Sequence, residues 1–308
     1  MLYGVVDIGS NTVKLNVYNS RDNDISIEFS EKENLGLLFY INNGKLTNEG
    51  IEELVTVLKK MKNDLDYLKI DSYSFFSTAA LRNIENSDEV IQIIKDQVNI
   101  EIDLLSGEEE GELSFFGSIP TIKRDDGILI DLGGGSVEIV LFKDRKIDEK
   151  YSIPIGFLKM FNDYVSDIIP NKEECKLIEE RTYSELDKIG LENNEKIPFM
   201  CGVGGSIRAI KKILVNLDLQ KKKVDLIDIK LLKQLKEELK LNESNHNNYI
   251  YYKILHVKPS RVHTLVPALL IVESITSYFG CEELQISKFS VREGYLYKKM
   301  LNEVTKHV

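Results

Sequence analysis

Two glycine-bearing segments decide the fold of this chain: DIGSNT at residues 7–12 and DLGGGSVE at residues 131–138. Strand-forming residues precede each segment, at 2–6 and 127–130, and follow it, at 13–18 and 139–142. Two such runs around a glycine-rich turn predict a β-hairpin. The chain therefore contains two similar hairpins, about one domain length apart.

The turns of both hairpins have the composition of a phosphate-binding loop. Glycines let backbone N–H groups approach a phosphate closely, and hydroxyl and amide side chains add donors. A third glycine-rich segment, residues 200–206, runs from a predicted strand into a predicted helix, whose N-terminus attracts anions. The predicted phosphate ligands are Gly9, Ser10, Asn11, Thr12, Gly133, Gly134, Gly135, Ser136, Gly204, Gly205 and Ser206.

Asp7 and Asp131 end the first strand of each hairpin. Because a carboxylate repels a phosphate, we expect each Asp to hold a divalent cation, or its water shell, against the phosphate oxygens. Taken singly, either Asp fits equally well as the cap of a tight turn. The repetition favours the cation, and it predicts that the two aspartates face each other across a cleft. Oxygen ligands suit either Mg²⁺ or Mn²⁺.

The pattern between and after the hairpins predicts two α/β units that meet near residues 120–126. The expected elements of the first unit are a helix over 46–68 with Thr47 as N-cap, a strand over 72–77, a helix over 88–97, a strand over 100–105 and a helix over 108–116. Residues 207–241 are predicted to be rich in helix, as are 249–276, with Pro259 and Pro267 marking a bend or a new start.

Composition places the chain among globular proteins. It has 308 residues, 43% hydrophobic content and a formal net charge of −10. That charge argues against nucleic acid as a partner, and it requires a local basic patch or a metal for any polyanion. We expect no membrane span and no signal peptide, and the three unclustered cysteines suit the reduced cytoplasm.

Further motifs carry a resemblance to a known family. STAALR at 77–82, with Asn86 four residues later, and LSGEEEG at 105–111 accompany the glycine segments, and SVREG lies at 290–294. In this order they resemble the exopolyphosphatase and guanosine pentaphosphate phosphohydrolase (Ppx/GppA) family, within the actin, sugar kinase and heat-shock ATPase superfamily. The resemblance covers nearly the whole chain. It implies an α/β fold of two ribonuclease H-like domains flanking a central cleft, at 1–122 and 123–290, with a helix at about 291–308 packing back on the first.

The resemblance also implies an activity: metal-dependent release of terminal orthophosphate from inorganic polyphosphate, and of the 5′ γ-phosphate of guanosine pentaphosphate as a second substrate. It places the catalytic base at Glu110, with Glu109 as fallback, and a functional acid at Glu138, which we assign to the metal with Asp7 and Asp131. Clustered carboxylates raise one another's pKa, which suits a base near neutral pH. Arg82 is the candidate phosphate clamp, because a guanidinium binds in a bidentate manner.

Several features stay open at this stage. Lys14 fits either a phosphate contact or an exposed position. The lysines at 211, 212 and 221–223 fit a basic track for a phosphate chain, although a solvated helix face is the more common explanation. His256 and His263 lie seven residues apart, but their neighbourhood lacks further metal ligands.

The chain also departs from the family pattern. His263 stands where the family usually has Asp, and Lys159 stands where arginine is common. The given sequence ends before the C-terminal helical extension of long members, so we expect the short, two-domain form. Two other functions are weighed against the hydrolase, a small-molecule kinase of the same superfamily and a non-catalytic sensor of polyphosphate or an alarmone. The sequence does not choose between the two substrates, and a homodimer is expected only from the resemblance.

Overall fold

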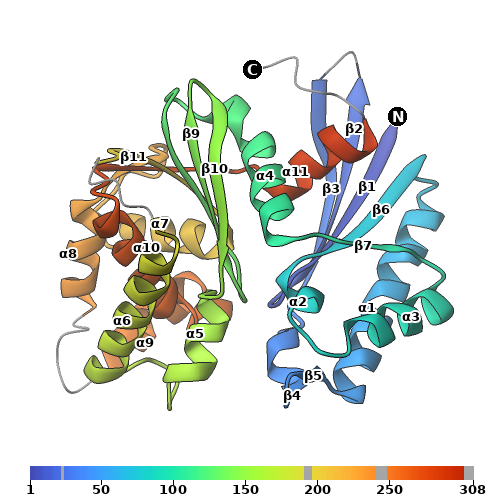
Figure 1. Ribbon diagram of the computed structural model, residues 1–308, viewed down its shortest axis with the longest axis horizontal. Coiled ribbons are helices and arrows are strands. Elements are labelled where there is room, and N and C mark those ends of the chain that lie inside the picture. Colours follow the sequence, from blue (N-terminus) through green and yellow to red (C-terminus); the bar gives the residue numbers. More distant parts are fainter. Residues whose placement is uncertain (22–23, 191–195, 240–247, 302–308) are drawn as a thin grey trace.

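The protein folds into two α/β lobes, as Figure 1 shows. The computed structural model describes residues 1–21, 24–190, 196–239 and 248–301. The five-stranded sheet of the first lobe has the order β3-β2-β1-β6-β7. Its strands are β1 (Leu2–Ile8), β2 (Val13–Arg21), β3 (Asp24–Glu33), β6 (Ser72–Ser77) and β7 (Ile102–Leu104).

Three helices accompany this sheet: α1 (Asn48–Tyr67), α2 (Ala79–Arg82) and α3 (Ser87–Val98). A 3₁₀ turn (Leu37–Tyr40) and the short strands β4 (Ile41–Asn42) and β5 (Lys45–Leu46) precede α1. The hydroxyl of Thr47 caps α1 by accepting from the Gly50 N–H, as predicted. Leu54, Leu58 and Met61 on one face of α1 are fully buried, and each stabilises the lobe by about 1.5–3 kcal/mol.

The six-stranded sheet of the second lobe has the order β10-β9-β8-β11-β13-β12. Its strands are β8 (Gly127–Leu132), β9 (Val137–Lys143), β10 (Lys146–Ile153), β11 (Phe199–Val203), β12 (Leu226–Asp228) and β13 (Glu283–Ile286). Its helices are α5 (Phe157–Tyr164), α6 (Lys172–Lys188), α7 (Gly205–Asn216), α8 (Lys230–Glu238), α9 (Asn248–Val257) and α10 (Leu265–Tyr278), with a 3₁₀ turn at Pro259–Arg261.

The two sheets share one strand arrangement. In each lobe a hairpin strand pairs antiparallel with the next strand, which pairs antiparallel with a third. On its other side the same hairpin strand pairs parallel with a later strand, followed by another parallel strand. The repetition seen in the sequence is therefore a repetition of topology.

Two helices between the lobes join them: α4 (Gly107–Ser118) and α11 (Val291–Tyr295), which continues into a π-helical turn at Leu296–Met300 (Figure 1). Their backbones touch, because a Cβ on Gly294 would lie 1.8 Å from the Leu113 carbonyl oxygen, and one on Gly117 would lie 2.2 Å from that of Ser290. The predicted division at residues 122 and 123 falls between a 3₁₀ turn (Ile119–Thr121) and β8. Residues 302–308 of the predicted C-terminal helix lie outside the described residues.

Some predicted elements differ from the structure. The helix-rich segment 207–241 is interrupted by β12, and residues 240 and 241 lie outside the described part. The edge strands β3 and β10 were not predicted. All three cysteines are buried with free thiols. Within the described ranges, no helix is long and apolar enough to cross a membrane.

Candidate active site

The two glycine turns have the same backbone hydrogen bond and lie against each other. The N–H of Gly9 donates to the Thr12 carbonyl at 3.1 Å, and the N–H of Gly133 donates to that of Ser136 at 3.0 Å. A Cβ on Gly134 would lie 3.1 Å from the Ser10 Cβ, so the lobes meet at these turns. The structure thus brings together the two turns that were predicted to bind phosphate.

The third glycine segment lies beside the second hairpin. Gly204 has a φ of 118°, which favours glycine, and a Cβ there would lie 2.8 Å from the Leu132 carbonyl oxygen. Ser206, in the first turn of α7, is fully buried, and its hydroxyl accepts from Arg261 Nη1 at 2.9 Å. Arg261 was not predicted as a site residue, although it lies in the segment that contains His263.

Arg82 connects two buried carboxylates between the lobes. Its Nη1 lies 3.0 Å from Glu110 Oε2, and its Nη2 lies 3.5 Å from Glu138 Oε1. Burial and then the neighbouring Glu138 raise the pKa of Glu110 well above its usual value, against the effect of Arg82. The predicted base and the predicted clamp therefore form one cluster.

Glu109 precedes Glu110 on α4, but its side chain caps the helix and does not join the buried cluster. Its carboxylate accepts from the Ser106 N–H at 3.0 Å, and the Ser106 hydroxyl accepts from the Glu109 N–H, which together form a capping box. The Ser106 N–H holds the pKa of Glu109 below its usual value. A carboxylate used as a cap and kept ionised is a poorer base than the buried Glu110.

Asp131 and Glu138 are directly opposite each other on β8 and β9. Ser114 of α4 donates to Asp131, while Ser136 and Ser152 donate to Oε1 of Glu138 at 2.7 and 2.9 Å. Burial raises the pKa of Glu138 to about 7, and Asp131 adds to the rise. Burial also raises the pKa of Asp131.

These two carboxylates suit a cation. Among the described residues, the buried Oε2 of Glu138 has no hydrogen-bond partner. No three His, Cys, Asp or Glu side chains in that part of the chain form a metal site on their own. Mg²⁺ is commonly held by one or two carboxylates together with substrate phosphates and water. Asp131 and Glu138 would supply two such carboxylates.

Asp7 has cationic neighbours instead. Its Oδ2 lies 2.8 Å from Arg292 Nη1 and 3.8 Å from Lys14 Nζ. Arg292 comes from the SVREG segment, and no role was predicted for it. Burial lowers the pKa of Lys14 to about 8, and the positive charge of Arg292 adds to this effect.

A basic cavity of about 290 Å³ lies between the lobes next to these residues. Burial and then Arg208 lower the pKa of Arg261, at its wall, to about 10. Lys212 lines the cavity, whereas Lys211 forms an ion pair with Asp225. The lining residues are Lys14, Asn16, Ser30, Glu31, Lys32, Gly205, Arg208, Ala209, Lys212, Lys258 and Arg261.

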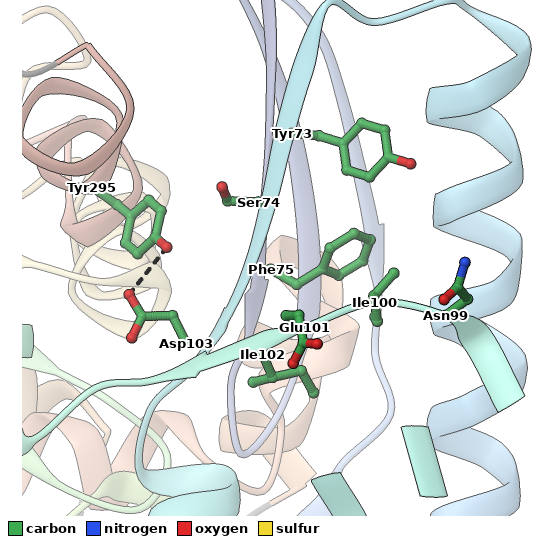
Figure 2. A pocket seen from close by; sticks show the side chains of 9 residues that line it. All are labelled: Tyr73, Ser74, Phe75, Asn99, Ile100, Glu101, Ile102, Asp103 and Tyr295. Carbon is green, nitrogen blue, oxygen red and sulfur yellow. Dashed lines mark hydrogen bonds between the residues drawn. The ribbon is translucent and has the colours of Figure 1, made fainter. Parts of the chain in front are cut away.

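A second cavity lies away from this site, between β6, β7 and α11 (Figure 2). It has a volume of about 420 Å³, and Tyr295 donates to Asp103 at its wall. The described residues that line it include none of the predicted site residues and no lysine or arginine.

His263 lies between two aromatic rings, 6.0 Å from Phe39 and 5.1 Å from Phe161 between centroids. Burial and then Arg261 lower its pKa. His256 stacks on Tyr252, with 5.8 Å between centroids. Neither histidine belongs to a metal cluster of the described residues.

The fold and the site define a two-lobed α/β protein with a charged cluster between paired glycine turns. The chain belongs to the Ppx/GppA phosphatase family, whose model matches residues 16–303.

Curated relatives are similar at low identity. One is a bifunctional 3-dehydroquinate synthase/phosphatase of Fusobacterium nucleatum, 27% identical over 297 residues, covering 92% of this chain and 44% of the relative. Another is exopolyphosphatase 1 of Mycobacterium tuberculosis, 27% identical over 194 residues, covering 60% and 55%. The chain therefore spans about half the length of these relatives.

Solved structures confirm the expected fold. The Ppx/GppA family member of Aquifex aeolicus has a TM-score of 0.80 at 24% identity, with 99% of both chains covered. An exopolyphosphatase of Cytophaga hutchinsonii has a TM-score of 0.86 at 22% identity, also with 99% of both chains covered. The phosphatase class thus comes from the family, and the fold from these structures.

Proposed function

We propose that this protein is a metal-dependent phosphoanhydride hydrolase that removes terminal orthophosphate from inorganic polyphosphate. One observation carries the proposal: Arg82 joins the buried carboxylates of Glu110 and Glu138, and its Nη2 lies 3.4 Å from the Ser136 hydroxyl of the second glycine turn. The family and the relatives named as exopolyphosphatases support it. The basic cavity lined by Lys14, Arg208 and Arg261 suits a chain of phosphates.

In the proposed step, the oxygen of a water molecule forms a bond to the terminal phosphorus while the bond to the bridging oxygen breaks. Glu110, with its raised pKa, accepts a proton from that water. The bridging oxygen leaves with the electron pair as the new end of the shortened chain, and orthophosphate is released.

Arg82 and the turn N–H groups other than those of Gly9 and Gly133, which donate within their own turns, stabilise negative charge on the transferred phosphoryl oxygens. Asp131 and Glu138 would hold Mg²⁺ or Mn²⁺, which when bound neutralises charge on the phosphate chain. Glu138 needs to be ionised for that role, and its pKa of about 7 allows it above neutral pH.

The cavity favours polyphosphate over guanosine pentaphosphate. Of the described residues that line it, six are Lys or Arg, one is acidic, and none is aromatic. A guanine base would find no ring on which to stack there, an interaction that contributes about 1–3 kcal/mol per base in proteins that use it. A linear chain of phosphates would meet cations along the cavity. Because both substrates end in the same anhydride, guanosine pentaphosphate is the second substrate to test.

The test is phosphate release with Mg²⁺ from short-chain polyphosphate, long-chain polyphosphate, guanosine pentaphosphate and ATP. Glu110→Gln is run in parallel, with Glu109→Gln as the matched control on the same helix. We expect release from polyphosphate by the parent and by Glu109→Gln, and its loss in Glu110→Gln.

Release that survives in Glu110→Gln would refute the assignment of the base. No release from any substrate by the parent would refute the hydrolase. Binding without turnover would then favour a sensor, and transfer to an added acceptor would favour a kinase. The homodimer implied by the resemblance stays a prediction, which light scattering can test.

A further inference from the structure

The two hairpins are equivalent in backbone but not in charge. Asp7 and Lys14 are direct cross-strand partners on β1 and β2, at the same steps within their segment as Asp131 and Glu138 on β8 and β9. The first aspartate therefore faces a cation, and the second faces another acid. Cross-strand partners have Cβ atoms about 4.5–5.5 Å apart, so the side chains of each pair are within reach of each other.

The surroundings of Asp7 strengthen the difference. Arg292 and Lys14 both approach the same carboxylate oxygen, Oδ2. Arg292 is buried, with 7% of its surface exposed, and Lys14 also lines the basic cavity. A divalent cation bound at Asp7 would be repelled by two fixed cations within a few ångströms.

We propose that Asp7 is not a metal ligand but the anchor of a cation pair, holding Lys14 and Arg292 at the phosphate-binding side of the first turn. The metal then belongs to the second hairpin alone, at Asp131 and Glu138. This inference rests on the proposed hydrolase function, and it replaces the expectation that the two aspartates share one role.

The inference gives the SVREG segment a role. Arg292 donates to Asp7 at 2.8 Å, and the next residue, Glu293, accepts from the Tyr18 hydroxyl of β2 at 2.6 Å. Glu293 also accepts from the Ser290 N–H at 2.7 Å, which caps α11. The segment thus fixes the first hairpin while Gly294 packs against α4, the helix that bears Glu110. Asp7 is therefore a positioning residue that acts through Lys14 and Arg292.

The first test measures metal binding without turnover. Mn²⁺ is titrated into the parent, Asp7→Asn and Asp131→Asn with orthophosphate present, and free Mn²⁺ is followed by electron paramagnetic resonance. We expect Asp131→Asn to weaken Mn²⁺ binding at least ten-fold and Asp7→Asn to change it less than two-fold. Comparable weakening in both variants would overturn the inference.

The second test is a double-mutant cycle that needs no metal. Tripolyphosphate binding in EDTA is measured by calorimetry for the parent, Asp7→Asn, Lys14→Met and the double variant. An anchor predicts that the two changes are not additive, with Asp7→Asn adding less than two-fold once Lys14 is gone. Additive effects would contradict the anchor.

The two tests separate this inference from the proposed function. A parent that binds tripolyphosphate and shows the coupling, but releases no phosphate, would refute the hydrolase and keep the anchor. Asn is isosteric with Asp and still accepts a hydrogen bond from Arg292, and circular dichroism checks the fold of each variant. If Asp7→Asn does not fold, the cycle is repeated with Arg292→Lys, for which the anchor predicts the same coupling to Lys14 and additivity contradicts it.

Discussion

The first and second hairpins differ most at the position opposite their aspartate, which is Lys14 in one lobe and Glu138 in the other. Their turns share one backbone hydrogen bond, and their sheets share one topology. We infer that this difference in side-chain charge directs the first hairpin towards anions and the second towards cations.

Burial shifts the pKa values of Lys14 and Glu138 in opposite directions. Burial lowers the pKa of Lys14 to about 8 and raises the pKa of Glu138 to about 7, since in both cases it disfavours the charged form. Each group therefore gains its charge readily when a ligand of opposite charge arrives. We therefore expect substitutions in the first hairpin to affect phosphate binding, and substitutions in the second to affect metal binding.

The largest expected effect lies between the hairpins, at Glu110. Glu110→Gln should lower kcat for polyphosphate by about 10²–10⁴-fold, the usual contribution of a general base. Binding of tripolyphosphate in EDTA should change little, because Arg82 and both turns remain. A variant that lost binding and kcat together would mean that Glu110 maintains the site and does not act as its base.

The next largest effect is expected when the first hairpin is made to resemble the second. Lys14→Glu would put two acids opposite each other in the first lobe and remove a cation from the basic cavity. KM for polyphosphate should rise about 100-fold, which corresponds to ~2.7 kcal/mol. Lys32→Glu, at a more exposed position of the same cavity, is the control and should have a smaller effect. An unchanged KM in Lys14→Glu would show that the first turn does not face the phosphate chain.

Stability should depend on pH with opposite sign in the two hairpins. Between pH 4.5 and 7, folded Glu138 keeps a proton that the unfolded chain has released, so its contribution to the free energy of unfolding falls as pH rises. Glu138→Gln should therefore gain stability relative to the metal-free parent across this window, on the order of 3 kcal/mol by pH 8.

Between pH 8 and 10.5, unfolded Lys14 keeps a proton that the folded state has released, so its contribution rises with pH. Lys14→Met should accordingly lose its relative advantage across that second window. Urea unfolding in EDTA at several pH values measures both, and pH-independent differences would contradict the burial of these charges.

The smallest effect is expected when the Ser114 hydroxyl, which donates to Asp131, is removed. Ser114→Ala removes the donor from α4 to this buried carboxylate, and should cost about 1–3 kcal/mol of stability. Because that hydrogen bond lowers the pKa of Asp131, its loss should also raise the Mg²⁺ concentration needed for half-maximal activity. Ser118→Ala, on the same helix but bonded to the Phe289 carbonyl, should leave the Mg²⁺ requirement unchanged.

Local patterns predicted the parts of the fold that depend on neighbouring residues. The hairpins follow from glycine turns between strand formers, and the cap of α1 follows from Thr47 before an amphipathic run. Strands β3 and β10 were missed because they are edge strands with many charged and exposed residues. Strand β12 was missed because three residues do not establish a period.

The site was predicted where residue type and motif agree, and missed where it depends on distant partners. Arg82 and Glu110 were named from motifs, and the structure places them in one cluster. Arg292 and Asp7 are 285 positions apart, so no local pattern could show their ion pair. Arg208 and Arg261 line the cavity only because α7 and the Pro259–Arg261 turn fold together.

The most direct test of the difference between the hairpins is steady-state kinetics of Lys14→Gln and Glu138→Gln, varying polyphosphate and Mg²⁺ independently. The account predicts that Lys14→Gln raises KM for polyphosphate about ten-fold with an unchanged Mg²⁺ requirement. Glu138→Gln should raise the Mg²⁺ requirement at least about ten-fold and leave KM at saturating Mg²⁺ nearly unchanged. If both variants changed KM for polyphosphate, or both changed the Mg²⁺ requirement, the assignment of phosphate binding to the first hairpin and metal binding to the second would be wrong.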